Sequence, residues 1–329
     1  MPPVPPSPLP PLPAVFLRSD ARAMGLPVQR LRRTDVERVG PALYRRTDRP
    51  LIGWASVGLP EPEHGRPGQH LWALQRSRPQ VVFSHATAAH LHGLPSPRRP
   101  GPLPTPLDVT VSSGSGRIRV PEVRARRRPL PAPHVVELFG LRVTSLERTI
   151  LDLCVLDDPW DLADVVAAAD HAVRHPWTEN GRRPPATTPA RLESALRELG
   201  PFHGVRTARA VLERMRVGAD SPYETFLRLA LVDAGLPEPH LQARPRAEEW
   251  DCPEVDLYVA EADVALQYDG ESHLTPERQA ADARRDAWLL ARGCPTLRVN
   301  RLDHREGYRR VIGLVRDRLE QRRADPGGP

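Results

Sequence analysis

The segment 254–273 holds the residues whose types and spacing could do chemistry. Two short runs of alternating apolar and polar residues, 255–259 and 264–268, flank a polar break, and this pattern predicts a β-hairpin. Side chains alternate between the two faces of a strand, so the acids and amides of both runs share one face. Oxygen-bearing side chains gathered in this way could hold a hard cation such as Mg²⁺.

The expected register places particular polar residues opposite one another. A four-residue loop would pair Val259 with Val264, and directly paired residues have Cβ atoms about 5 Å apart. The hairpin would then bring together Asp256 with Gln267 and Glu254 with Asp269. One patch of sheet would therefore carry several side-chain oxygens.

A histidine follows the hairpin closely. Gly270 allows the chain to turn sharply, so His273 can return near the strand end. The ordinary pKa of histidine, near 6.5, suits a general acid or base. An ordinary loop histidine is the alternative.

The elements around this hairpin would position it. Ser221 and Pro222 open a helix that Gly235 closes, and Thr275 and Pro276 open a long helix. The predicted helices and strands of this region are a helix to 234, strands at 241–244, 255–259 and 264–268, a helix at 276–292, a strand at 296–300 and a helix at 308–321. The order is α-β-β-β-α-β-α.

This order, with acids on the central hairpin, resembles the PD-(D/E)XK nuclease superfamily. The closer resemblance is to its uncharacterised branch related to very-short-patch-repair (Vsr) endonucleases, and it covers roughly residues 221–322. The residues that carry it are Val255-Asp256, Tyr268-Asp269-Gly270, His273, Asp282-x-x-Arg285-Asp286-x-x-Leu289, Gly293 and Leu297-Arg298-Val299.

The resemblance implies a Mg²⁺ or Mn²⁺ site. In those nucleases an acid on the first hairpin strand is the central metal ligand, and Asp256 matches it. The next acid would fall at Gln267, where this sequence departs from the pattern. Asp269 stands at the superfamily's lysine position and could replace the lost carboxylate. Glu224, on the preceding helix, could complete the site or serve a capping box with Ser221.

Other charged residues would support the site or contact phosphates. Asp282, Arg285 and Asp286 are neighbours on the long helix and could brace the hairpin or His273, or form a charged helix face. Phosphate contacts are expected from Arg278, Arg284 and Arg298.

The N-terminal part carries a second set of signals. Segment 15–50 contains a short helix, a glycine turn, a basic helix with Arg30, Arg32 and Arg33, and a wing, which predicts a winged helix-turn-helix that contacts DNA. Three packed elements with solvated arginines are the alternative.

Thr144-Ser145-Leu146-Glu147 predicts a capping box. The run Arg124-Ala125-Arg126-Arg127-Arg128 could lie against phosphates or form a basic surface.

The region 15–173 is similar to AbiEi-type antitoxin proteins, which carry a winged helix followed by an α/β region with a Thr-Ser-x-x-Arg-Thr segment, here 144–149. That similarity implies DNA and a toxin protein as partners. The predicted organisation is a disordered proline-rich tail (1–14), a winged helix-turn-helix (15–50), an antitoxin-like α/β region (51–175), a linker with helices (176–220), a Vsr-like nuclease-fold domain (221–322) and a disordered tail (323–329).

Composition agrees with a polyanionic partner. The 329 residues carry a net charge of +6, and all 47 basic residues are arginine, whose planar fork suits phosphate. Three scattered cysteines favour a reduced, cytoplasmic setting, and no apolar run approaches a membrane span.

The sequence predicts either a Mg²⁺-dependent DNA endonuclease or a non-catalytic DNA-binding regulator with a degenerate nuclease fold. It leaves RNA open as a substrate.

Overall fold

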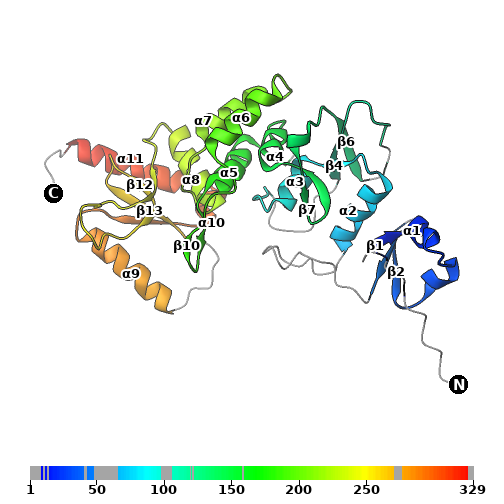
Figure 1. The fold of residues 1–329 in the computed structure, drawn as a ribbon. Helices are drawn as coiled ribbons and strands as arrows, with labels where there is room; N and C mark the ends of the chain where they lie inside the picture. The colour runs from blue at the N-terminus through cyan, green and yellow to red at the C-terminus, as the bar shows by residue number, and fades with distance from the viewer. Residues whose placement is uncertain are drawn as a thin grey trace. The chain divides into compact units, whose positions relative to one another are not determined.

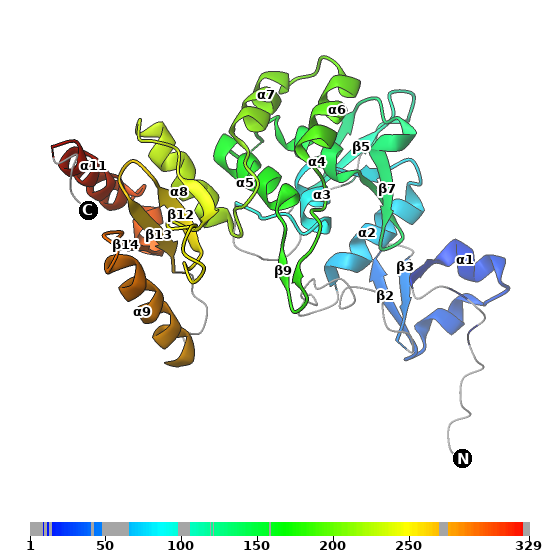
Figure 2. The same cartoon turned by 60° about the vertical axis from the view of Figure 1, so that its left-hand side comes forward.

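The protein is a mixed α/β molecule whose internal contacts divide it into two compact units, Met1–Leu153 (unit 1) and Cys154–Pro329 (unit 2). Figures 1 and 2 show the helices and strands of each in a computed structural model. It describes residues 9, 12, 15–40, 43–47, 66–97, 106–118, 120, 122–157, 159–269 and 276–324. No helix in these ranges is long and apolar enough to cross a membrane.

Unit 1 begins with a small antiparallel sheet. Strands β1 (Val15–Leu17), β3 (Leu43–Arg46) and β2 (Val36–Gly40) lie in the order β1-β3-β2, with helix α1 (Arg18–Ala23) after the first strand. Gly25, at φ 76°, ends that helical turn as expected. The predicted basic helix is only a five-residue 3₁₀ segment, η1 (Val28–Arg32), because the backbone is extended again at Arg33. The segment expected to form the wing consists of the antiparallel strand pair β2 and β3.

The proline-rich tail is not wholly separate from this core. Leu12 is buried and packs in one apolar cluster with Phe16 and Leu31, and its carbonyl accepts a hydrogen bond from the Arg46 guanidinium. The prediction of a disordered tail through residue 14 is therefore wrong at Leu12, because burial of its apolar side chain in this cluster is favourable.

A five-stranded sheet forms the rest of unit 1. Its order is β6-β5-β4-β8-β7, with β4 parallel to β8 and β5 parallel to β6. The elements are α2 (Arg66–Ser77), β4 (Val82–Phe83), α3 (His85–Leu91), β5 (Leu107–Val111), β6 (Val123–Arg127), η3 (Ala132–His134), β7 (Val135–Leu138), β8 (Leu141–Thr144) and α4 (Leu146–Leu153). Leu71, Phe83, Val109 and Val143 bring α2 and the strands into one apolar core.

The start of α4 differs from the predicted capping box. Ser145, not Thr144, caps the helix, since its Oγ accepts from the Arg148 backbone N–H at 3.2 Å. Thr144 instead shares a hydrogen bond of 2.7 Å with the Thr149 hydroxyl. The helix therefore starts one residue later than the motif suggested.

Unit 2 contains a four-stranded sheet, β11-β12-β13-β14, in which only the β13–β14 pair is parallel. Its elements are α8 (Pro222–Asp233), β11 (His240–Ala243), β12 (Val255–Val259), β13 (Val264–Tyr268), α9 (Pro276–Leu290), β14 (Thr296–Val299), α10 (Arg301–Arg305) and α11 (Arg309–Ala324). This matches the predicted order, with α10 added. The last helix also continues into the predicted C-terminal tail, as far as Ala324.

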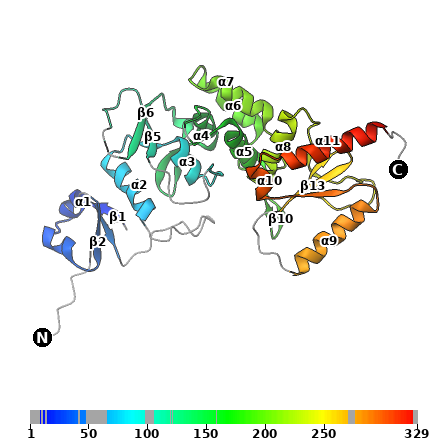
Figure 3. The same ribbon diagram turned by 180° about the vertical axis from the view of Figure 1, so that it is seen from behind.

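Helices cover both faces of this sheet, as Figure 3 shows for α9 and α11. Leu227 of α8 and Val315 of α11 share a core with Leu257 and Leu266 on one face. Leu289 of α9 packs with Ala265 on the other. The result is a three-layer α/β/α arrangement with the hairpin β12–β13 at its centre.

The elements before α8 also belong to unit 2. They are α5 (Leu162–Val173), β9 (Trp177–Thr178), β10 (Gly181–Arg182), α6 (Pro189–Leu199) and α7 (Val205–Arg214). Helix α5, assigned above to the antitoxin-like region, packs against α8 instead. Its buried Asp170 pairs with buried Arg228 of α8 at 3.1 Å. The observed division after Leu153 thus differs from the predicted boundaries at 175 and 220.

Candidate functional site

The hairpin has the predicted register as far as Asp256 and Gln267, whereas Glu254 and Asp269, which were predicted to face each other, bind Arg182 and Arg298. Val259 pairs with Val264 and Leu257 with Leu266, so the next opposed residues are Asp256 and Gln267. Gln267 Nε2 donates to Asp256 Oδ1 at 2.7 Å. The period of two along both strands is enough to bring these side chains together.

The backbone hydrogen bonds between β12 and β13 stop immediately beyond this pair. The Tyr268 backbone N–H donates to Asp256 Oδ2 at 2.8 Å, so a side-chain carboxylate accepts where a strand carbonyl ordinarily would. Asp256 is therefore held at both oxygens. Burial raises its pKa to about 6, against the opposing effects of the Tyr268 N–H and the Arg285 charge.

Glu224 reaches the same region from the first turn of α8. Ser221 Oγ accepts from the Glu224 N–H, and Glu224 Oε2 accepts from the Asp220 N–H at 2.9 Å and from Gln242 Nε2 at 3.2 Å. Burial, followed by the charge of Asp256, raises the pKa of Glu224 to about 7. Of the predicted capping box, the Ser221 half is present, whereas the Glu224 carboxylate accepts from the N–H of Asp220 and not from that of the N-cap Ser221. A metal-binding role for Glu224 stays a prediction.

Several polar residues at this site were not predicted from the sequence. The Arg182 guanidinium of β10 donates to both oxygens of Asp220, at 3.1 and 3.2 Å, and also to Gln242 and Glu254. Segment 176–220 was assigned to a linker. Asn180-Gly181 is a strong hairpin signal and could have revealed the β9–β10 turn.

Asp269 has other partners. Its Oδ1 accepts from Arg298 Nη1 at 2.9 Å, and Asp269 is about 41% exposed. The same guanidinium binds Asp286 at 2.7 Å and lies 3.6 Å from Asp282, so these two acids of α9 contact Arg298 of β14. The contacts of Asp269 thus differ from the prediction that it joins Asp256 in one ligand set.

The remaining site residues divide by what the structure describes. His273 and the Arg278 side chain lie outside the described residues. Arg284 is exposed on α9 and pairs with no described residue, whereas Arg298 is engaged by carboxylates. Arg285 is paired with Asp282 and also acts on the Asp256 charge.

The predicted DNA-contacting arginines of unit 1 differ in exposure. Arg32 and Arg33 are exposed. Arg30 is only 9% exposed, and its guanidinium donates to Asp35 at 2.7 Å. The prediction that Arg30 lies on a DNA-facing surface is therefore wrong. Segment η1 is a 3₁₀ helix, and the Arg30 side chain is buried.

The acid site offers a small set of oxygen ligands. Among the described residues, no three His, Cys, Asp or Glu side chains are grouped closely enough to hold a metal ion by themselves. Mg²⁺, however, is commonly bound by one or two carboxylates, water and substrate phosphate. Asp256 and Glu224 supply two carboxylates, and the buried Gln267 Oε1 has no hydrogen-bond partner in the described part of the chain. These residues fit an incomplete cation site.

Comparison with known proteins adds no family assignment. No protein-family model matches the sequence, and a search of curated proteins likewise gives no match.

Proposed function

We propose that unit 2 is a nuclease domain that hydrolyses DNA phosphodiester bonds with Mg²⁺ or Mn²⁺ held by Asp256 and Glu224. The observation that carries this proposal is the convergence of two acids from separate elements, half-buried Asp256 of β12 and buried Glu224 of α8, beside an amide oxygen that has no hydrogen-bond partner among the described residues. Two neighbouring carboxylates removed from water resist ionisation together, and a cation between them would relieve that cost.

The residues have distinct roles in this proposal. Asp256 and Glu224 bind the cation, and Gln267 Oε1 faces it as a neutral ligand. Arg182 holds Asp220 and Glu254, which keeps the surrounding acids oriented. When bound, the cation activates water and offsets charge on the phosphate. Exposed Arg284 on α9 would contact the DNA backbone.

The α-β-β-β-α-β-α order supports a restriction-endonuclease-like, Vsr-like architecture for residues 221–322. Unit 1 would supply DNA binding through its small N-terminal sheet and the exposed Arg32 and Arg33. In this scheme the two units divide binding and cleavage between them.

Plasmid cleavage tests the enzyme. Purified full-length chain should nick or linearise plasmid DNA with Mg²⁺ or Mn²⁺, and Asp256→Ala and Glu224→Gln should each lose that activity. Glu261→Ala, which removes an exposed acid from the turn between the two strands, should cleave as the wild type does. Wild-type cleavage no faster than that of Asp256→Ala would end the enzymatic proposal.

A second candidate is a non-catalytic DNA-binding regulator. Gln267 favours it, because an amide in place of an acid contributes no charge to a cation site. The pairing of Asp269 with Arg298 favours it too, since that carboxylate is already neutralised. Salt-dependent DNA retention without cleavage would support this candidate, and copurification with a toxin protein would extend it to the antitoxin role.

A further inference from the structure

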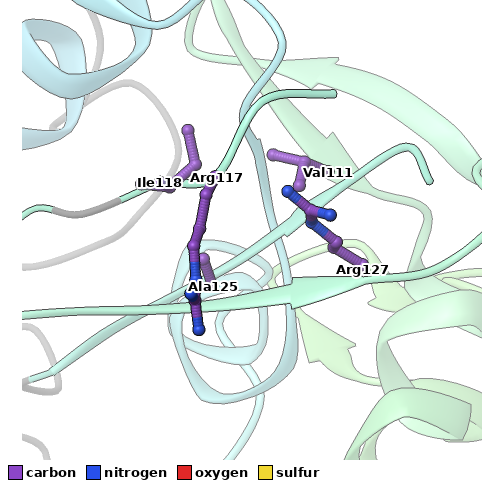
Figure 4. A pocket seen from close by; sticks show the side chains of 5 residues that line it. All are labelled: Val111, Arg117, Ile118, Ala125 and Arg127. Atoms are coloured by element: carbon purple, nitrogen blue, oxygen red, sulfur yellow. The ribbon is translucent and has the colours of Figure 1, made fainter. Parts of the chain in front are cut away.

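Unit 1 contains a cavity of about 370 Å³ at the edge of its five-stranded sheet. Figure 4 shows its lining: Val111, Arg117, Ile118, Ala125 and Arg127. Strand β6 is the edge strand, and Arg127 and Val111 are directly paired across β6 and β5. The cavity thus lies on one defined face of this strand pair.

Among the described residues, the two arginines of the cavity have no counterion. Within the described ranges, neither the Arg117 nor the Arg127 guanidinium makes an ion pair or hydrogen bond, and both side chains are exposed. Two cations held around one cavity without an acid favour an anionic occupant.

The alternation of β6 places its other arginines on a different face of the strand. Arg124 and Arg126 point to the opposite face, where buried Asp108 binds both, at 3.2 and 2.6 Å. Arg127 and Ala125 point to the cavity face, on which Val111 and Val109 are their partners. The arginine-rich run therefore contains two arginines paired with Asp108, Arg124 and Arg126, and one, Arg127, that pairs with no described residue.

The rest of the lining is apolar. Val111 is buried, and Ile118 is half-buried beside it, so the base of the cavity offers hydrocarbon rather than hydrogen bonds. Pockets for small organic ligands span roughly 300–1,000 Å³, and inorganic phosphate alone would leave this apolar surface uncovered. The occupant should combine a phosphate with an organic group.

We propose that this cavity binds a nucleoside phosphate, free or at the end of a nucleic-acid strand. The guanidinium forks of Arg117 and Arg127 bind the phosphate oxygens, and the sugar or base lies on Val111, Ile118 and Ala125. Planar guanidinium matches phosphate in paired hydrogen bonds. This site is separate from the acids of unit 2 and does not depend on cleavage.

Calorimetric titration of the full-length chain tests the proposal with adenosine 5′-monophosphate, adenosine and inorganic phosphate. The nucleotide should bind tighter than either by about tenfold or more, since only it uses both halves of the cavity. The double variant Arg117→Gln/Arg127→Gln should weaken nucleotide binding by about tenfold or more. A matched control, Arg22→Gln/Arg78→Gln, removes the same charge from exposed positions of unit 1 and should keep wild-type affinity.

Short single-stranded oligonucleotides with and without a 5′-phosphate separate the two sources of ligand. Preference for the phosphorylated strand that needs Arg117 and Arg127, with no binding of the free nucleotide, supports the strand end as the ligand. Equal affinity for nucleotide and adenosine without any strand-end preference overturns the proposal, and so does equal loss in the control variant. Asp256→Ala should bind nucleotide normally, so failure of the nuclease leaves this test intact.

Discussion

Gln267 donates a hydrogen bond of 2.7 Å to Asp256 from the neighbouring strand. The amide stands where a second carboxylate would face the first, and its Oε1 is buried without a partner among the described residues. The ability of the site to bind a cation therefore depends on Asp256 and on Glu224, which comes from a different element.

Replacing this amide with an acid tests how the site tolerates charge. Gln267→Glu should lower Tm in EDTA by roughly 2–6 °C, because two carboxylates would then lie in contact in a partly buried place. Adding Mn²⁺ should raise the Tm of this variant more than that of the wild type. The exposed change Gln321→Glu is the control, measured by the same thermal scans. Identical Tm values for both variants in EDTA would contradict the argument.

Stability of the metal-free protein should depend on Glu224 in a defined pH window. Burial and Asp256 raise the pKa of Glu224 to about 7, so the folded state keeps a proton that the unfolded chain releases from about pH 4.5 upward. The folded state is therefore progressively disfavoured as pH rises from about 4.5 to 7.

Glu224→Gln removes that penalty. In EDTA the variant should unfold with a free energy about 2 kcal/mol above the wild-type value at pH 8, and the gain should vanish near pH 4.5. Denaturant titrations at the two pH values measure it. Glu193→Gln, at an exposed position, should show no such difference. A gain of equal size at both pH values would refute the assignment.

The buried pair between α5 and α8 should control the stability of unit 2. Asp170 accepts from Arg228 at 3.1 Å, from the Thr225 hydroxyl at 2.9 Å and from the Arg216 N–H at 2.6 Å. Asp170→Ala should cost about 3–5 kcal/mol, because it removes the buried one of the two carboxylates that pair with the buried Arg228 guanidinium and leaves the Thr225 hydroxyl and the Arg216 N–H without their acceptor. Asp233→Ala removes an exposed acid paired with Arg214 and should cost less than about 1 kcal/mol. Similar losses in both variants, measured by urea unfolding, would exclude a special role for the pair.

If unit 1 binds DNA through η1, Arg32→Gln/Arg33→Gln should weaken binding of any duplex and reduce the salt slope by about 2. Arg30→Gln should instead destabilise the fold, since it breaks the ion pair between the buried Arg30 guanidinium and half-buried Asp35. Fluorescence anisotropy across a salt series measures the slope, and a thermal scan measures the stability. An unchanged slope in the double variant would remove η1 from the DNA-binding surface.

Local sequence patterns were enough for the hairpin. A period of two and a short polar loop predict that Asp256 faces Gln267, and the observed register agrees. The order of elements in residues 221–324 was equally accessible, because Ser221, Pro276 and the glycines after the helices mark their ends. At Thr144 the same kind of local rule placed the helix cap one residue too early.

By itself, then, the sequence determined the strand pairing at the centre of unit 2 and the acids placed on it. Only the tertiary structure decided that Glu224, Gln242 and Arg182 meet around Asp220, that Asp269 pairs with Arg298, and that Arg30 is buried while Arg127 lines a cavity. Side-chain alternation acts between adjacent residues and can be read locally. Convergence of separate elements depends on how helices and strands pack, and that packing is set by contacts distant in sequence.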